Sequence, residues 1–327
     1  MESTPATPGV TVLIPTWNAG GDFPAALAAI QRQRVDRALE ILVIDSGSTD
    51  GTVEFLRRHP IRLVEIPNHE FNHGLTRARG IREARGEIVV LLVQDAQPAD
   101  DLWLQRLIDA FDDDHVAGAY SCQIPRADAA PFIRDRIRHA APPSETPQIR
   151  SVASPAAYEG LAPAEKARLA SFDNVSSAVR RRVALDIPFT AARFGEDLDW
   201  GRRVLLAGYK IVYEPRSKVI HSHNRSAGYE FRRVFLDHQV RYRLFGVRRV
   251  PRRRDVIRST LGSAASAFRI IARDRDLRFA ARVVWAARAL PYSFGQSLAQ
   301  YLGAKSAIAG ENSRFYRWLV ARLARGI

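Results

Sequence analysis

Cysteine, methionine and long apolar runs are all scarce in this chain of 327 residues. The single cysteine, Cys122, cannot form a disulfide within the chain, and a zinc site of four cysteines is excluded. Such cysteine usage fits a reducing, cytoplasmic location. No apolar run approaches the roughly 18 residues of a membrane span, and the polar residues 1–8 lack the basic and apolar regions of a signal peptide. We therefore expect a protein that does not cross a membrane but is able to lie on one.

Acidic residues are fewer than basic ones, 35 against 49, which leaves a net charge of +14. This excess favours an anionic partner, either nucleic acid, a membrane surface or a phosphorylated substrate. The arginines gather between residues 225 and 327, notably at 248–254. A solvated basic face is the alternative interpretation. Because no helix-turn-helix, zinc or RNA-binding pattern accompanies the charge, nucleic acid is not expected as a partner.

Apolar residues make up 46% of the chain, enough for a sizeable core, and they alternate between short β-branched runs and helical spacing. The expected strands are 10–14, 39–44, 61–66, 87–93 and 117–124, and the expected helices are 23–33, 52–59, 75–85 and 102–111. This alternation predicts an α/β fold with a mostly parallel sheet and helices on both faces. Ligands bind beyond the carboxyl ends of the strands in such sheets.

The rest of the chain divides into a loop, one more sheet segment and a helical region. Residues 126–170 are rich in Ala and Pro, with Pro142-Pro143, and predict a long, partly mobile loop. A strand at 209–213 is expected to enter a turn at Pro215 before 219–223. The predicted C-terminal helices are 229–245, 255–272, 277–290 and 314–325, with Pro291 and Gly310 between them.

The last predicted helix, Arg314 to Arg325, is basic and amphipathic. Helices of this kind lie in membrane interfaces. Packing on its own domain or on a second subunit is an equal alternative, and the latter would make the protein a homo-oligomer through its C-terminal helices.

Polar motifs follow the first, second and fourth predicted strands. They contain Pro15, Thr16 and Asn18; Asp45, Ser46 and Asp50; and Gln94 and Asp95. Carboxylates at strand ends can accept hydrogen bonds from a base or a ribose, or hold Mg²⁺ beside a diphosphate. The alternatives are an Asx turn with Asp50 as a helix cap, and a plain strand-to-helix turn at Asp95.

Three further groups carry chemistry. Asn72, His73 and Arg77 could point donors at a sugar or phosphate, or merely cap a helix. A carboxylate pair, Glu196-Asp197, stands at a helix start, and the histidines of 221–223 stand at a strand end. That arrangement suits a site that takes a proton from one substrate and binds the charged group of another. Favourable interaction with the helix dipole is the alternative for the carboxylates.

Together these motifs resemble an inverting glycosyltransferase of family 2 with the GT-A fold, over residues 10 to about 225. The elements DSGSTDGT (45–52) and EDLDW (196–200) stand in the family's order and spacing. The closer resemblance is to bacterial rhamnosyltransferases. It is carried by FNHG-T-R (71–77), QDA with Pro98 (94–98), FDNVSSA (172–178) and HSH (221–223).

The resemblance implies roles for individual residues. Asp197 matches the catalytic base, Glu196 would orient it, and Trp200 would line the acceptor site. Asp45 would read the nucleotide base, with Asp50 nearby. The remaining residues of the motifs would contact substrate: Pro15, Thr16, Asn18, Ser46, Asn72, His73, Arg77 and Gln94.

The resemblance also implies a divalent metal, Mg²⁺ or Mn²⁺. Asp95 matches the second acid of the family's DxD motif, whereas Val93 occupies the place of the first acid. His223, or less favourably His221, would complete the metal site or contact the diphosphate.

The implied activity is single-displacement hexosyl transfer. A sugar, by resemblance L-rhamnose from dTDP-β-L-rhamnose, would move to a hydroxyl of a cell-envelope polysaccharide or lipid-linked glycan. Residues 1–225 would form the catalytic domain, with 126–170 on the acceptor side. The basic region 226–327 would hold the enzyme on anionic lipid at the cytoplasmic face of the bacterial plasma membrane. The alternatives are another donor, a UDP- or GDP-hexose, and a non-catalytic nucleotide-sugar-binding protein.

Overall fold

The computed structural model describes residues 9–140, 144–192 and 194–325. The chain divides into two compact units. The first comprises residues up to 124 together with 141–161 and 168–221, and the second comprises 125–140, 162–167 and 222–327. The predicted lead of residues 1–8 and the pair Pro142-Pro143 lie outside the described residues. The predicted boundary at residue 225 stays a prediction.

The first unit is built on a nine-stranded sheet. Its strands are β1 Val10–Thr16, β2 Leu39–Asp45, β3 Arg62–Glu65, β4 Ile88–Leu92, β5 Gln97–Pro98, β6 Val116–Ile124, β7 Gln148–Arg150, β8 Ser176–Arg180 and β9 Lys210–Ile220. The order is β3-β2-β1-β4-β8-β6-β9-β5, with β7 also paired to β9. Only β5, β7 and β8 run against the others. The predicted α/β fold with a mostly parallel sheet is therefore confirmed.

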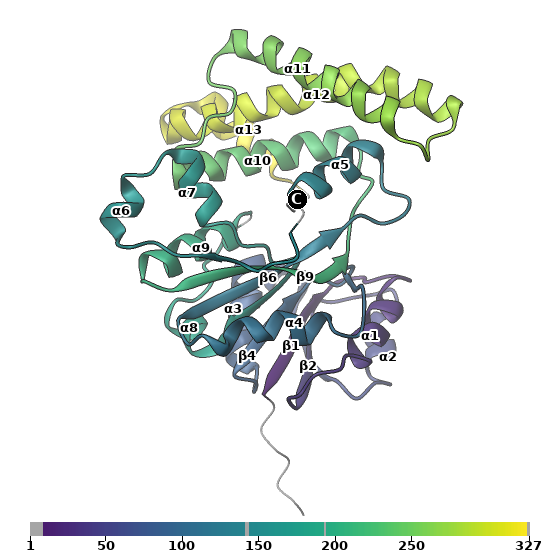
Figure 1. Ribbon diagram of the computed structural model, residues 1–327, viewed down its shortest axis with the longest axis vertical. Coiled ribbons are helices and arrows are strands. Elements are labelled where there is room, and N and C mark those ends of the chain that lie inside the picture. The colour runs from purple at the N-terminus through teal and green to yellow at the C-terminus, as the bar shows by residue number, and fades with distance from the viewer. Residues whose placement is uncertain (1–8, 141–143, 193, 326–327) are drawn as a thin grey trace, which may run out of the picture. The chain divides into compact units, whose positions relative to one another are not determined.

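Helices cover both faces of this sheet (Figure 1). On one face lie α1 Phe23–Gln31, α2 Thr52–Leu56 and α4 Trp103–Ile108; on the other lie α3 His73–Glu83, α8 Arg181–Asp186 and α9 Glu196–Leu206. Alternate residues of β1 point to opposite faces, so Val12 packs with the core under α1 and α4 while Leu13 packs against Gly80 of α3. Two buried faces explain why β1 reads as a continuous apolar run.

The strand register places the predicted motifs at one edge of the sheet. Thr16 at the end of β1 pairs with Asp45 at the end of β2, and Leu13 pairs with Leu91 of β4. Parallel strands therefore deliver their following loops, including the one that contains Asp95, to the same side.

The structure corrects the predicted loop at 126–170. The described part of this segment contains α5 Pro131–Ala140, β7, α6 Pro155–Glu159 and α7 Pro163–Leu169. Pro131, Pro155 and Pro163 stand at the starts of α5, α6 and α7, where a missing N–H costs nothing. Pro155 follows Ser154, whose side chain accepts a bond from Ala157 N and caps α6.

Two proline positions were also predicted wrongly. Pro215 lies within β9 rather than in a turn, at a register shift where Ser121 pairs with Glu214 but Cys122 pairs with Lys218. The shift absorbs the residue that cannot donate to the ladder. Pro291 lies inside α12 Phe279–Ala309 and does not end that helix.

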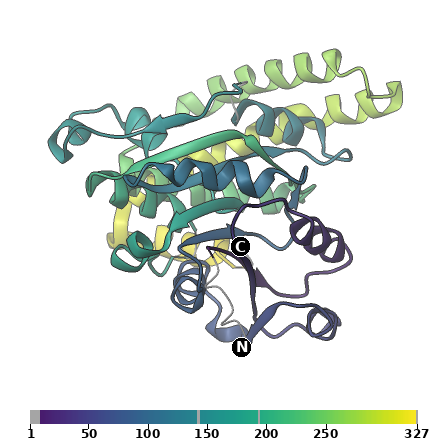
Figure 2. The same ribbon diagram turned by 60° about the horizontal axis from the view of Figure 1, so that its bottom comes forward.

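The second unit contains the predicted C-terminal helices, α10 Ala227–Phe245, α11 Arg253–Arg273, α12 and α13 Arg314–Leu323. Three short 3-10 turns, Asn68–Glu70, Asp109–Asp112 and Gly310–Asn312, complete the helical segments of the described chain. Phe132 of α5 stacks on Tyr292 of α12 at 5.0 Å between ring centroids. Figure 2 shows α11 and the first part of α12 as an antiparallel hairpin. Within the described residues, no helix has both the length and the apolar character to cross a membrane.

Candidate active site

Asp45 holds the loop between β2 and α2. Its Oδ1 accepts hydrogen bonds from the backbone N–H groups of Gly47 and Ser48, at 3.0 and 2.8 Å. Its Oδ2 accepts from the hydroxyls of Thr16 and Ser48, at 2.8 and 2.6 Å. The carboxylate is fully buried, and four donors saturate its lone pairs. In this structure Asp45 shapes the loop, and its role as reader of a nucleotide base stays a prediction.

The groups presented at this loop are exposed. Asn18 has a φ of 43°. Its amide oxygen accepts from Thr49 N at 2.8 Å, and its own N–H donates to Ser48 Oγ. Asp50 accepts from the Thr52 hydroxyl at 2.6 Å and from Gly20 N. The Thr52 hydrogen bond is the main cause that lowers the pKa of Asp50, so this carboxylate is charged at neutral pH.

Two other predicted residues at this edge are structural. The Ser46 hydroxyl donates to Thr16 O at 2.9 Å, and Ser46 is buried. Pro15 pairs within the sheet with Ile44. Both therefore fix the ends of β1 and β2.

Gln94 joins the loop after β1 to the loop after β4. Its amide oxygen accepts from Trp17 N at 2.8 Å, and its amide nitrogen donates to Trp17 O at 3.2 Å. This two-way bond places Asp95 beside the loop that contains Asn18. Val93, at the position of the missing first acid, packs against the apolar core and offers no ligand.

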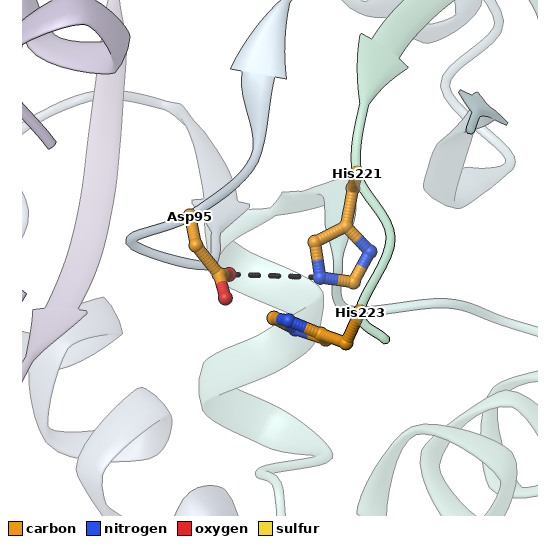
Figure 3. Close-up of side chains that lie close together, drawn as sticks. All are labelled: Asp95, His221 and His223. Carbon is orange, nitrogen blue, oxygen red and sulfur yellow. Dashed lines mark ion pairs between the residues drawn. The ribbon is translucent and has the colours of Figure 1, made fainter. Parts of the chain in front are cut away.

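Asp95 meets two histidines that follow β9 (Figure 3). One ligand atom from each of Asp95, His221 and His223 lies within 4.8 Å of the others. Asp95 Oδ1 is 3.5 Å from His221 Nε2. The sequence offered His221 and His223 as alternatives, whereas the structure brings both to Asp95. One carboxylate and two imidazoles form a donor set that suits a divalent first-row metal.

Hydrogen bonding fixes the tautomer of His221. The Gln123 amide nitrogen donates to Asp173 Oδ2 at 2.5 Å, so the amide oxygen of Gln123 faces His221 Nδ1 at 3.0 Å. Nδ1 must then carry hydrogen, because two acceptors would otherwise meet. In the neutral imidazole, the Nε2 lone pair then faces the Asp95 carboxylate. Two electron-rich atoms facing each other across this gap favour a cation between them.

The same hydrogen bonds lead from this cluster toward Asp197. Asp173 accepts the hydrogen bond from the Gln123 amide nitrogen. Its negative charge contributes to raising the pKa of Asp197. Hydrogen bonds therefore run from the cluster at Asp95 through Gln123 to Asp173, and a charge interaction links Asp173 to Asp197. The predicted convergence of the loops of Asp45, Asp95 and Asp197 stays a prediction, which this chain of interactions supports.

Asp197 stands in the first turn of α9. Gly195 precedes it with a φ of 77°, a left-handed conformation that favours glycine. Asp197 is half-buried, and its Oδ1 accepts from Leu198 N at 2.7 Å. Burial, with the negative charges of Glu196 and Asp173 adding to it, raises the pKa of Asp197 to about 8. A carboxylate with such a pKa is a strong enough base to accept a proton from an alcohol as its C–O bond forms.

Glu196 and Arg77 form a buried ion pair behind Asp197. Arg77 Nη1 is 3.0 Å from Glu196 Oε1, and the two side chains are 6% and 9% exposed. Asn174 Nδ2 also donates to Glu196, at 3.3 Å. Arg77 additionally donates to His73 O at 3.0 Å. Arg77 thus connects α3 to α9, and its predicted contact with a phosphate stays a prediction.

The start of α3 is capped by Asn72, whose amide oxygen accepts from Gly74 N and Leu75 N, both at 3.1 Å. The capping alternative for Asn72 therefore describes the structure. A Cβ on Gly74 would lie 1.9 Å from Thr190 O, so glycine permits α3 to approach the segment before α9. His73 lies on the exposed surface at this point.

Trp200 packs beneath α9. Its side chain is fully buried, stacks on Phe189 at 5.1 Å and contacts Phe172. Its indole N–H donates to Ile187 O at 2.8 Å. These contacts give Trp200 a supporting role under α9, and its predicted place in the acceptor site stays a prediction.

Sequence reasoning assigned no role to Gln123, Asp173 or Asn174. Asp173 and Asn174 belong to the FDNVSSA element, whose polar pair directly before a buried strand was the available signal. Gln123 gave none, since its role depends on the position of β6 beside β9.

Known proteins match both sequence and fold. The glycosyl transferase family 2 model matches residues 11–185. The chain is 31% identical over 232 residues to the O-antigen chain rhamnosyltransferase RfbN of Salmonella typhimurium, covering 69% of this chain and 70% of that protein. It is also 31% identical to the O-antigen chain rhamnosyltransferase WbaN of Salmonella anatum, covering 70% of each.

A solved structure of glucosyl-3-phosphoglycerate synthase from Mycobacterium tuberculosis, in complex with Mn²⁺, UDP-glucose and phosphoglyceric acid, covers 73% of this chain and 80% of that one. The TM-score is 0.51 at 19% sequence identity, so this likeness concerns the fold and supports the predicted GT-A type. Since the family model matches more than half of the chain and two relatives exceed 30% identity over two thirds of it, this chain is a glycosyltransferase that belongs to glycosyl transferase family 2.

Proposed function

We propose that the protein transfers L-rhamnose, with inversion, from dTDP-β-L-rhamnose to a hydroxyl of a cell-envelope polysaccharide or lipid-linked glycan. The observation that carries the proposal is the shared sequence with two O-antigen rhamnosyltransferases. Two features of the site support it. The Asp197 carboxylate has a raised pKa. The cluster of Asp95, His221 and His223 is able to hold a cation and is linked toward Asp197 through Gln123 and Asp173.

Asp197 acts as the general base. Its carboxylate takes the proton of the acceptor hydroxyl while the oxygen forms a bond to the anomeric carbon. The bond between that carbon and the diphosphate breaks on the opposite face, and dTDP departs with the electron pair. One carboxylate is sufficient, because direct displacement inverts the configuration without a glycosyl-enzyme intermediate.

Asp95, His221 and His223 would hold a divalent metal. When bound, such an ion supplies Lewis-acid stabilisation of the departing diphosphate. The Gln123 amide orients His221 through its Nδ1, as carboxylate or carbonyl partners do for metal-bound histidines.

The exposed residues of the first two loops are the proposed nucleotide contacts. Trp17 is 54% exposed, and Asn18 and Asp50 lie beside it. Asp45, Ser46 and Thr16 hold the loops in place behind them.

Donor choice is tested with purified protein, Mn²⁺ and four nucleotide sugars: dTDP-β-L-rhamnose, UDP-glucose, UDP-N-acetylglucosamine and GDP-mannose. We expect dTDP-β-L-rhamnose to give the largest thermal shift and the fastest release of nucleoside diphosphate. A preference for a UDP- or GDP-sugar would replace the donor while keeping the enzyme class. Binding of a donor without release of diphosphate, with or without lipid-linked glycan extracts, would favour a non-catalytic protein.

The Asp173→Asn substitution should shift the pH profile of the reaction. In the wild type, we expect kcat/KM to rise with pH to a plateau above the Asp197 pKa of about 8. Removing the charge of Asp173 lowers the pKa of Asp197, so the rising limb should move to lower pH. Asn still accepts from Val175 N as Asp173 Oδ1 does.

Asp199→Asn is the matched control, since Asp199 lies on the same helix and is paired with Arg203 at 2.8 Å. An equal loss of activity at every pH for Asp173→Asn, with the limb unmoved, would reduce Asp173 to a structural role.

We also propose that the enzyme works at the cytoplasmic face of the plasma membrane, where lipid-linked acceptors are made. The basic C-terminal region, with its arginines at 248–254 and on α13, supports this location. The alternative is that two copies of the protein associate through the C-terminal helices of this region.

A further inference from the structure

An exposed apolar stripe runs along α11 and α12. On α11, Ile257, Leu261 and Phe268 are 65%, 60% and 47% exposed. On α12, Phe279, Val283, Leu290 and Phe294 are also exposed. Spacings of four and seven residues place each set on one side of its helix.

The two sets meet in one groove. Ile257, Thr260 and Leu261 of α11 face Leu290, Pro291 and Phe294 of α12 around a cavity of about 430 Å³. The Thr260 hydroxyl donates to Val256 O at 2.8 Å, which leaves the groove wall apolar. We name this surface, made of the seven exposed residues above and the groove, the α11–α12 face.

The α11–α12 face is not needed for the core of its own unit. The opposite sides of the two helices are already packed: Ala267 and Ile271 of α11 and Ala289 of α12 surround Phe132 of α5. Large exposed apolar patches of this kind mark interaction surfaces.

Positive charge is concentrated in the segment that carries the face. Residues 248–294 contain twelve arginines and three aspartates. Two of those aspartates, Asp274 and Asp276, are paired with Arg134. Arg258 and Arg269 are exposed on α11 one residue after Ile257 and Phe268. Long arginine side chains beside an apolar stripe can reach phosphates while the stripe enters the acyl region.

We propose that the α11–α12 face docks the enzyme on a bilayer that contains anionic phospholipid. The inference rests on the proposed function, because a lipid-linked acceptor lies at such a surface. It moves the main contact from α13, where the sequence placed it, to the groove between two longer helices. A second copy is the less favourable occupant, because two such faces would bring their arginines together and the like charges would repel. Anionic lipid attracts the same arginines.

The test is flotation of the full-length protein with vesicles of phosphatidylglycerol and phosphatidylethanolamine, compared with phosphatidylcholine alone. The wild type should float with the anionic vesicles only. Leu261→Ser with Phe294→Ser should lower the bound fraction at least tenfold, and so should Phe279→Ser with Val283→Ser, whose side chains are 82% and 54% exposed. The second pair guards against a folding defect in the first.

The matched control is Phe315→Ser with Trp318→Ser on α13, two residues that are 57% and 61% exposed. This variant should float like the wild type. All variants should keep the donor-induced thermal shift and nucleoside diphosphate release, measured without vesicles, so a failed docking proposal is distinguishable from a failed enzyme proposal.

Three results would overturn the inference: equal flotation of the groove variants and the wild type, loss of flotation in the α13 variant alone, and equal binding to phosphatidylcholine. A wild type that ignores vesicles but elutes as a dimer, which the groove substitutions convert to monomer, would assign the α11–α12 face to a second copy.

Discussion

The Asp197→Asn enzyme should lose sugar transfer by a factor of at least about 10² to 10⁴, the range typical for removal of a general base. Asparagine keeps the size and the hydrogen bond from Leu198 N but cannot take the acceptor's proton. Donor binding should persist, because the loops of Asn18 and Asp95 are unchanged. Single-turnover transfer and donor-induced thermal shift separate these two quantities.

The same substitution should make the protein more stable, and by an amount that depends on pH. Burial raises the pKa of Asp197 from 3.8 to about 8. Between these values the folded protein holds a proton that the unfolded chain has released, so the free energy of unfolding falls as pH rises through this window and is constant above it. Asparagine is neutral at every pH. The gain in melting temperature should therefore be small at pH 5 and largest above pH 8.

Glu196→Gln is the matched control for stability, because it removes the same charge from the neighbouring residue. Glu196 neutralises the buried guanidinium of Arg77 at 3.0 Å, and leaving a buried charge without its partner costs up to about 3–5 kcal/mol. We expect a lower melting temperature across the pH range. A higher melting temperature for Asp197→Asn and a lower one for Glu196→Gln would show two different roles. The charge of Asp197 destabilises the fold, whereas the charge of Glu196 stabilises the contact between α3 and α9.

Full turnover by Asp197→Asn would refute the base assignment. An equal stability gain at pH 5 and pH 9 would show instead that the pKa of Asp197 in the folded wild type is not raised.

The sheet and its polar edge could be predicted from the sequence, because both depend on where the strands begin and end. Apolar β-branched runs fixed the strands, and parallel strands send their following loops to one edge. That is why Asp95 lies beside the loop that contains Asn18. Asp197 comes after the antiparallel strand β8 and α8, so this rule does not place it, and its convergence with Asp95 stays a prediction. The sequence could not show which polar side chains the fold itself uses. Asp45, Arg77 and Trp200 lie at predicted motif positions, yet internal partners occupy their polar groups.

Residues that act through distant neighbours escaped sequence reasoning for a related reason. Gln123 touches both His221 and Asp173, which are 98 and 50 residues away in the chain. No spacing rule connects them, because strand order rather than sequence order brings them together. The two prolines were predicted wrongly because only local rules were applied. These rules predicted a turn at Pro215 and a helix end at Pro291, whereas β9 and α12 continue through these residues.

Divalent metal should bind the wild type through Asp95, His221 and His223, with Mn²⁺ stabilising it more than Mg²⁺. Mg²⁺ demands oxygen ligands in octahedral geometry, whereas two of the three donors here are imidazoles. Affinity for nitrogen-containing sites rises from Mn²⁺ through Co²⁺, so Co²⁺ should raise the melting temperature further still. Thermal shift with each metal alone measures binding without any substrate.

Chelation should lower transfer at least 100-fold, and Mn²⁺ should restore it better than Mg²⁺. Asp95→Asn and His223→Ala should abolish both the Mn²⁺-induced thermal shift and the rescue, whereas His139→Ala, which removes an exposed histidine of α5, should leave them intact. A wild type that shows no Mn²⁺ shift and transfers sugar in chelator would overturn the assignment.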